Sequence, residues 1–216
     1  MIVLIGSQKG GCGKSTIAVN VAAELAREGH DVVLVDSDRQ STAANWALDR
    51  EEHIDLPRVH CIQRYENISS TLIDLAGRYK YVVVDAAGRD SRELRTGMAA
   101  ANLMVVPFRP SQPDLDTLPH LDEVVTQAKD LNPELTVRAL LTMVPTNPQI
   151  REVQQSLEYL NDYPAIAPLT SLIRDRKVYR DAIAEGRGVG EMKNPKAREE
   201  MHRLMKELFN GQTSRT

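Results

Sequence analysis

A glycine-rich segment near the amino terminus constrains the fold of this 216-residue chain more than any other feature. The segment Lys9–Thr16 reads KGGCGKST and lies between an apolar run, Ile2–Ile5, and a helical pattern expected from about Ser15 to Glu28. A strand, a glycine-rich loop and a helix in this order form a P-loop, whose backbone N–H groups converge on phosphate oxygens. The segment departs from the G-x-x-x-x-G-K-[ST] pattern because Gln8 replaces the first glycine and an additional lysine, Lys9, precedes the glycine pair.

The residues of this loop have separate predicted roles. Lys14 is expected to reach the β- and γ-phosphates of a nucleotide, and the Ser15 hydroxyl is expected to hold Mg²⁺. A thiol at a helix amino terminus can be activated, but we interpret Cys12 as a small residue that the loop tolerates. The cofactor-binding set predicted for the loop is Lys9, Gly10, Gly11, Cys12, Gly13, Lys14, Ser15 and Thr16.

Short β-branched runs alternate with helical patterns along the chain, as in repeated strand–helix–strand units. The runs are apolar on consecutive residues, which is expected of strands covered by helices on both faces. They span Ile2–Ile5, Val32–Asp36, Val59–Ile62, Tyr81–Asp85, Leu103–Pro107 and Thr136–Thr142. We therefore predict an α/β fold with a three-layer, doubly wound and mostly parallel sheet. No composition break marks a linker, so we expect one P-loop ATPase domain over residues 1–210 and a frayed tail over 211–216.

Two of the predicted strands end in carboxylates. The second strand runs into the D-x-D pair Asp36 and Asp38, and the fourth ends in Asp85. Ligands of open parallel sheets bind beyond the carboxyl ends of the strands, so these side chains should converge on the loop that holds Lys14. Each aspartate alone could be a turn or cap residue. The three together, beside a P-loop, favour a magnesium–nucleotide site.

Composition excludes several classes of function. The formal net charge is −3 and aromatic residues make up 4% of the chain, which excludes a strongly basic nucleic-acid binder and a stacking platform for single strands. The apolar runs are far shorter than the roughly 20 residues of a membrane-spanning helix, and no signal peptide precedes the first strand. We therefore expect a cytoplasmic protein that does not attach to membranes. Cys12 and Cys61 lack C-x-x-C spacing, which argues against a disulfide framework or a zinc site.

Positive charge is concentrated near the carboxyl terminus. Between Arg174 and Lys206 there are ten basic and six acidic residues, so this segment carries a charge of +4 and the remainder −7. Such a segment could be a solvated surface or a local anion-binding patch. Four of its basic residues can lie along one side of a helix and its exit: Arg176, Lys177, Arg180 and Arg187.

Five segments together resemble the ParA/MinD family of deviant Walker A ATPases. They are Lys9–Ser15, Asp36–Gln40, Val82–Gly88, Asn102–Pro113 and Ile173–Glu191, so the resemblance covers nearly the whole chain. The short length, without an added helix-turn-helix region, is most similar to small plasmid-type partition proteins. The resemblance implies an ATPase that binds ATP with Mg²⁺ and forms an ATP-dependent homodimer.

The resemblance also implies roles for single residues. Lys9 would supply positive charge to the partner subunit's nucleotide, Asp38 would position the attacking water, and Gly88 would sense the γ-phosphate. Asp85 would support Mg²⁺ through water. The implied catalytic residues are Lys9, Lys14 and Asp38, the implied metal-site residues are Ser15, Asp38 and Asp85, and Asp85 and Gly88 join the cofactor-binding set. Arg39 and Ala86-Ala87 depart from the residues common in the family, and these departures bear mainly on the rate of hydrolysis.

The function implied by the resemblance is DNA partition. The Mg-ATP dimer would bind non-specific double-stranded DNA of the nucleoid, and a centromere-binding ParB/ParG-like protein would stimulate an otherwise slow hydrolysis. Alternatives on the same fold are a MinD-like or compartment-positioning ATPase and, with less support, a small-molecule ligase or a metal carrier. Adenine is expected near the loops after Thr142 and Leu169. The residues implied to contact DNA are Arg174, Arg176, Lys177, Arg180 and Arg187.

Overall fold

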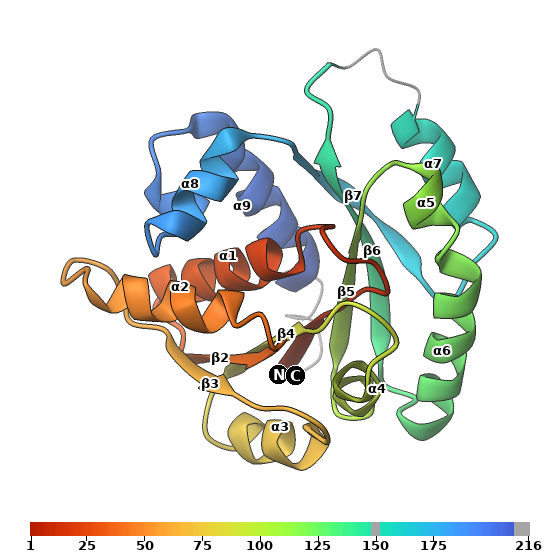
Figure 1. The fold of residues 1–216 in the computed structure, drawn as a ribbon, viewed down its shortest axis with the longest axis horizontal. Coiled ribbons are helices and arrows are strands. Elements are labelled where there is room, and N and C mark those ends of the chain that lie inside the picture. Colours follow the sequence, from red (N-terminus) through yellow and green to blue (C-terminus); the bar gives the residue numbers. More distant parts are fainter. Residues whose placement is uncertain (148–151, 210–216) are drawn as a thin grey trace.

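The structure is a computed structural model that describes residues 1–147 and 152–209, and a parallel β-sheet forms its centre (Figure 1). Within the described residues the sheet has seven strands in the order β3-β2-β4-β1-β5-β6-β7. Every neighbouring pair runs parallel. The strands are β1 (Ile2–Ile5), β2 (Val32–Ser37), β3 (His60–Gln63), β4 (Tyr81–Ala86), β5 (Leu103–Phe108), β6 (Thr136–Val144) and β7 (Ala167–Arg174).

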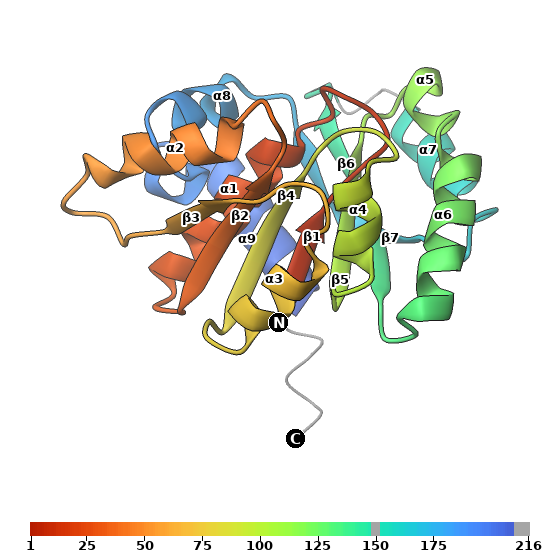
Figure 2. The same ribbon diagram turned by 60° about the horizontal axis from the view of Figure 1, so that its bottom comes forward.

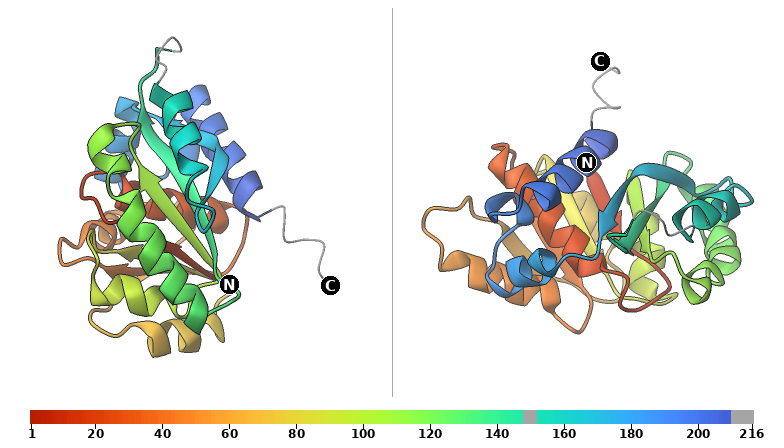
Figure 3. Two further views of the ribbon diagram at one scale, coloured as in Figure 1. Left: turned by 90° about the vertical axis from the view of Figure 1, so that its right-hand side faces the viewer. Right: turned by 90° about the horizontal axis from the view of Figure 1, so that it is seen from above.

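Helices cover both faces of this sheet, as Figure 3 shows. One layer contains α1 (Lys14–Arg27), α2 (Thr42–Glu51), α8 (Lys177–Ala184) and α9 (Pro195–Phe209), with a short 3-10 helix, η1 (Val189–Glu191), between the last two. The opposite layer contains α3 (Ser69–Ala76), α4 (Arg92–Met98), α5 (Gln112–Leu115), α6 (Leu118–Leu131) and α7 (Glu152–Leu160).

Side chains of the central strands alternate between two hydrophobic cores. In β1, Val3 and Ile5 pack in the core beneath α1, whereas Ile2 and Leu4 pack in the core on the other face. Both faces are therefore dry, which explains why this strand is apolar at every position. The predicted three-layer, doubly wound and parallel fold is confirmed.

The sequence pattern does not indicate the edge strand β7. Only Leu169 and Ile173 are buried in it, and its pairing with β6 is irregular between Pro168 and Leu172. An edge strand with a bulge lacks the continuous apolar run of the central strands. The expectation of a loop after Leu169 is therefore wrong, because Leu169 lies inside β7 and the strand continues to Arg174.

Two expectations concern the limits of the chain. The single domain over residues 1–210 stays a prediction, and the tail at 211–216 lies outside the described residues. None of the helices within the described ranges has both the length and the apolar character needed to cross a membrane.

Candidate functional site

The predicted P-loop connects β1 to α1 at the carboxyl edge of the sheet, which is the upper edge in Figure 2. Gly11 and Gly13 have φ angles of 75° and 89°, in the left-handed region that glycine adopts readily. The backbone N–H groups of residues 10–15 donate no hydrogen bond within the described part of the chain. A run of free N–H groups at a helix amino terminus is a cradle suited to phosphate oxygens.

The Lys14 side chain lies against its own loop. It is buried, and its Nζ donates a hydrogen bond to the Lys9 carbonyl oxygen at 3.2 Å. Gly88, in the loop after β4, closes over this group, since a Cβ added at Gly88 would lie 2.7 Å from the Lys14 Nζ. An ammonium group has three donors, so Lys14 can keep this bond and still donate to an anion in the cradle. The structure thus brings Lys9, Lys14 and Gly88 together.

Asp85 ends β4 directly beside the P-loop and is completely buried. Neither of its carboxylate oxygens has a hydrogen-bond partner. Burial raises the Asp85 pKa to about 7, although the neighbouring Ser15 hydroxyl and the charge of Lys14 act to lower this pKa. A buried carboxylate without a partner, close to a P-loop serine, fits the acidic side of a Mg²⁺ site, and the cation would relieve the desolvation cost.

The other two predicted carboxylates lie at the end of the neighbouring strand. Asp36 is the register partner of Asp85, and its two oxygens accept the backbone N–H groups of Asp38 and Ala44. Burial is the main cause that raises the Asp36 pKa. Asp36 therefore organises the turn between β2 and α2, whereas Asp38 is partly exposed and accepts the backbone N–H of Gln40.

Metal-binding capacity at this edge is limited. Among residues 1–147 and 152–209, no group of three or more His, Cys, Asp and Glu side chains is arranged to hold a metal ion. A cation here would need oxygens from phosphate or water in addition to Ser15 and Asp85, which is how Mg²⁺ is usually held in nucleotide sites. The predicted metal residues Ser15, Asp38 and Asp85 remain a prediction.

Lys9 points toward a different part of its own chain. Its Nζ donates a hydrogen bond to the carbonyl oxygen of Pro113 at 3.3 Å, at an exposed position. Pro113 belongs to the segment after β5, which a buried ion pair between Arg109 and Asp114 holds in place. The action of Lys9 on a partner subunit requires a second chain and stays a prediction.

A small cleft lies on the far side of the P-loop, where the sequence places the adenine. Gly13, Thr16 and Ile17 form one wall, Thr142 and Met143 at the end of β6 form the second, and residues 173–180 form the third. The expectation of an adenine site after Thr142 agrees with this cleft. The second expected segment begins after β7, at Asp175, rather than after Leu169.

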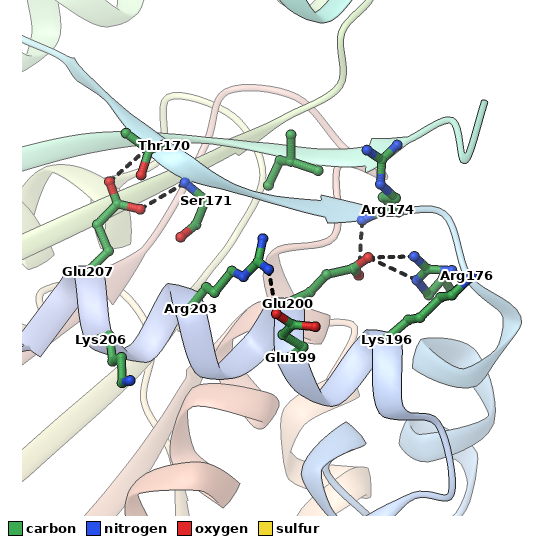
Figure 4. A pocket seen from close by; sticks show the side chains of 11 residues that line it. Thr170, Ser171, Arg174, Arg176, Lys196, Glu199, Glu200, Arg203, Lys206 and Glu207 are labelled. Carbon is green, nitrogen blue, oxygen red and sulfur yellow. Dashed lines mark hydrogen bonds and ion pairs between the residues drawn. The ribbon is translucent and has the colours of Figure 1, made fainter. Parts of the chain in front are cut away.

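The five residues implied to contact DNA do not form one surface, and each is bonded within the chain. Arg174 and Arg176 line a cleft between β7 and α9 (Figure 4), and Lys177, Arg180 and Arg187 are not among its lining residues. The intramolecular partners, in chain order, are Pro145 for Arg174, Glu200 for Arg176, Asp181 for Lys177, Asp175 for Arg180, and His53 and Glu185 for Arg187.

Sequence reasoning did not select three cations that line the same cleft, Lys196, Arg203 and Lys206 on α9. Their spacing of seven and three residues places them along one side of a helix, which was the available signal. It also did not select the Thr142 hydroxyl, which bonds to the P-loop backbone. No local motif announces Thr142, since its partner lies 130 residues away in the sequence.

Known proteins match this chain over most of its length. Residues 1–133 match the family described as ATPase MipZ. The carboxysome distribution protein A ("Maintenance of carboxysome distribution protein A") of Halothiobacillus neapolitanus is 27% identical over 95% of this chain and 94% of its own length. The protein of the same name from Gloeobacter kilaueensis is 30% identical over 92% of this chain and 88% of its own length.

Solved structures show the same fold at low sequence identity. Apo McdA from Cyanothece superposes with a TM-score of 0.77 at 15% identity, covering 96% of this chain and 99% of the McdA chain. MinD from Pyrococcus horikoshii OT3, solved with Mg-ADP, gives a TM-score of 0.73 at 17% identity, covering 96% and 95% of the two chains. The expected ParA/MinD resemblance, with its cofactors ATP and Mg²⁺, is confirmed. The chain belongs to the MipZ/ParA family of P-loop ATPases.

Proposed function

We propose that the chain is an ATP-driven positioning ATPase that distributes a protein compartment over nucleoid DNA. The observation that carries the proposal is that two relatives named for the maintenance of carboxysome distribution match 95% and 92% of this chain. Plasmid partition, the main function expected from the sequence, uses the same site and surface. The names of these relatives favour the compartment-positioning alternative.

In this proposal the P-loop residues bind the nucleotide. The free N–H groups of residues 10–15 and the Lys14 ammonium hold the phosphates, and Gly88 lies where a change at Lys14 is felt. Bound Mg²⁺, held by Ser15 and through water by Asp85, neutralises negative charge on the phosphates. Asp38 orients the attacking water, and Lys9 of one subunit supplies charge to the nucleotide of the other. Hydrolysis is slow until a protein on the cargo stimulates it.

The cleft between β7 and α9 is the surface that we assign to DNA phosphates (Figure 4). Its carboxylates are already committed: Glu207 accepts the Thr170 and Ser171 N–H groups at 2.7 and 2.8 Å, and Glu200 accepts Arg176. By contrast, Lys196 and Lys206 make no hydrogen bond or ion pair within the described residues. Free cations beside neutralised carboxylates favour a polyanion that is held without base recognition.

A gel shift on random-sequence DNA tests this proposal. Wild-type protein should bind DNA only with Mg-ATP, and the double substitution Lys196→Ala, Lys206→Ala should weaken binding and flatten its salt dependence by about 0.9 in log–log slope per lost phosphate contact. Lys177→Ala with Arg180→Ala is the matched control, because both residues are already paired with carboxylates. Binding that needs no ATP, or an equal loss in both double variants, would contradict the assignment.

A second experiment separates the two kinds of cargo. A candidate partner encoded with a protein compartment should raise ATP hydrolysis by the DNA-bound protein, whereas a centromere-binding ParB/ParG-like protein with its DNA site should not. The opposite result would support plasmid partition. ATPase activity with each partner, with and without DNA, is the measurement.

A further inference from the structure

A threonine on β6 contacts the back of the P-loop. Thr142 is buried, with 2% of its surface exposed. Its Oγ1 lies 2.7 Å from the carbonyl oxygen of Cys12 and 3.2 Å from that of Phe108. A hydroxyl group has one proton, and the shorter, better placed contact is the one to Cys12. The side chain therefore ties the last strand before the cleft to the middle of the P-loop.

The Cys12 carbonyl is not used by the helix that follows it. In an α-helix it would accept the N–H of Thr16, but the first intrahelical bond runs from the Ile17 N–H to the Gly13 oxygen at 2.9 Å. The Thr16 N–H donates no hydrogen bond within the described residues. Thr142 thus draws the Cys12 carbonyl away from the helix axis and leaves an additional N–H group free at the helix amino terminus.

The peptide bond between Cys12 and Gly13 carries this constraint to the site. A trans peptide is planar, so its C=O and N–H groups point in opposite directions. When the Cys12 carbonyl is held against β6, the Gly13 N–H must point away from β6. That N–H has no partner within the described residues, and Gly13 is in the left-handed conformation that this turn requires.

We propose that Thr142 is a positioning residue for the phosphate site: its hydroxyl fixes the Cys12–Gly13 peptide so that the Gly13 N–H faces a bound nucleotide. The proposal rests on the phosphate-binding role proposed for the P-loop. Valine at this position would keep the shape and burial of threonine but leave the Cys12 carbonyl without its donor. A buried carbonyl without a partner would turn toward water or toward the Thr16 N–H, and the Gly13 N–H would turn with it.

The test compares Thr142→Val with Thr142→Ser, which restores the hydroxyl. Calorimetric titration should show that Thr142→Val weakens the binding of both Mg-ADP and Mg-ATP by about tenfold, the range expected for one buried hydrogen bond, and that Thr142→Ser binds within about twofold of wild type. Thr136→Val, at the exposed start of the same strand, is the matched control. The nucleotide-free melting temperature of Thr142→Val should stay near that of wild type.

Two further readouts separate positioning from general damage. In ¹⁵N-glycine-labelled protein without nucleotide, the Gly13 amide signal should shift in Thr142→Val and return in Thr142→Ser. Unchanged nucleotide affinity in Thr142→Val, or a serine variant as weak as the valine variant, would overturn the proposal. If wild-type protein itself binds neither nucleotide, the proposed function fails instead.

Discussion

At the scale of single residues, the buried Asp85 dominates the energetics of the nucleotide-free site. Its carboxylate has no hydrogen-bond partner, and burial raises its pKa from 3.8 to about 7. Because the folded state holds this proton more tightly than the unfolded state, Asp85 contributes stability below pH 3.8 that is lost as the pH rises through about 7. Above pH 7 the folded protein carries a buried, unpaired charge, which P-loop nucleotide sites offset with Mg²⁺.

Asp85→Asn should therefore stabilise the nucleotide-free protein in a pH-dependent way. We expect its melting temperature to exceed that of wild type by on the order of 5 °C at pH 8, with a smaller difference at pH 5, where the wild-type carboxyl is protonated. Asp55→Asn, at an exposed position, is the control. A difference that is equal at both values of pH would show that the carboxylate charge is not the cause. Thermal unfolding in the absence of nucleotide and magnesium gives the measurement.

Single residues also show where sequence reasoning succeeds and where it stops. Lys14 and Asp85 were predictable because a P-loop has a fixed spacing and a strand places its last residue at the edge of the sheet. Thr142 was not predictable, since its role depends on one hydrogen bond across 130 residues of sequence. Likewise, the sequence shows Arg176 as a cation but does not show that Glu200 already neutralises it.

At the scale of elements, α2 is fastened to the segment before α9 by a buried ion pair. Arg50 on α2 bonds to Glu191 in η1 at 2.7 Å, and both side chains are almost completely buried. Arg50 also donates to the carbonyl oxygens of Pro57 and Gly186, so its guanidinium is well satisfied. This contact links the helix that follows the Asp38 turn to the segment that leads into the proposed DNA surface.

Breaking one side of this pair should cost more than replacing both sides. Arg50→Met leaves Glu191 as a buried, unpaired charge, and we expect a loss of about 3–5 kcal/mol in the free energy of unfolding. The double substitution Arg50→Met, Glu191→Met should recover much of that loss, because no charge remains buried. Arg78→Met, which removes an exposed pair with Asp74, should cost less than about 1 kcal/mol. Urea unfolding followed by circular dichroism measures all three; a double variant as unstable as Arg50→Met would contradict the argument.

The elements themselves were predictable to different degrees for a physical reason. Central strands such as β1 and β4 are buried on both faces, so their sequences are apolar without interruption. The edge strand β7 is half exposed and irregular, and its pattern APLTSLIR carries no such signal. Two of its backbone N–H groups bond to the Glu207 carboxylate rather than to another strand, which also protects this edge from pairing with other chains.

At the scale of the whole molecule, the net charge of −3 opposes DNA binding and the cations of α9 favour it. One chain offers few free cations, so its affinity for DNA should be low at physiological salt. A dimer would present two such surfaces to one duplex, and the second attachment would gain from the high effective concentration created by the first. ATP-dependent dimerisation is thus a sufficient switch for DNA binding, without any change inside the cleft between β7 and α9.

Lys9→Ala tests this switch, because it should leave the chain able to bind nucleotide but unable to support the dimer. We expect wild-type affinity for ATP by calorimetry, a monomer in ATP by light scattering, and at least a tenfold loss of ATP-dependent DNA binding. Lys14→Ala is the complementary variant, since it should lose nucleotide binding itself. If Lys9→Ala forms dimers in ATP as wild type does, its role in the partner's site is wrong. If it stays monomeric and still binds DNA as tightly as wild type, two linked surfaces are not needed and the switch lies within one subunit.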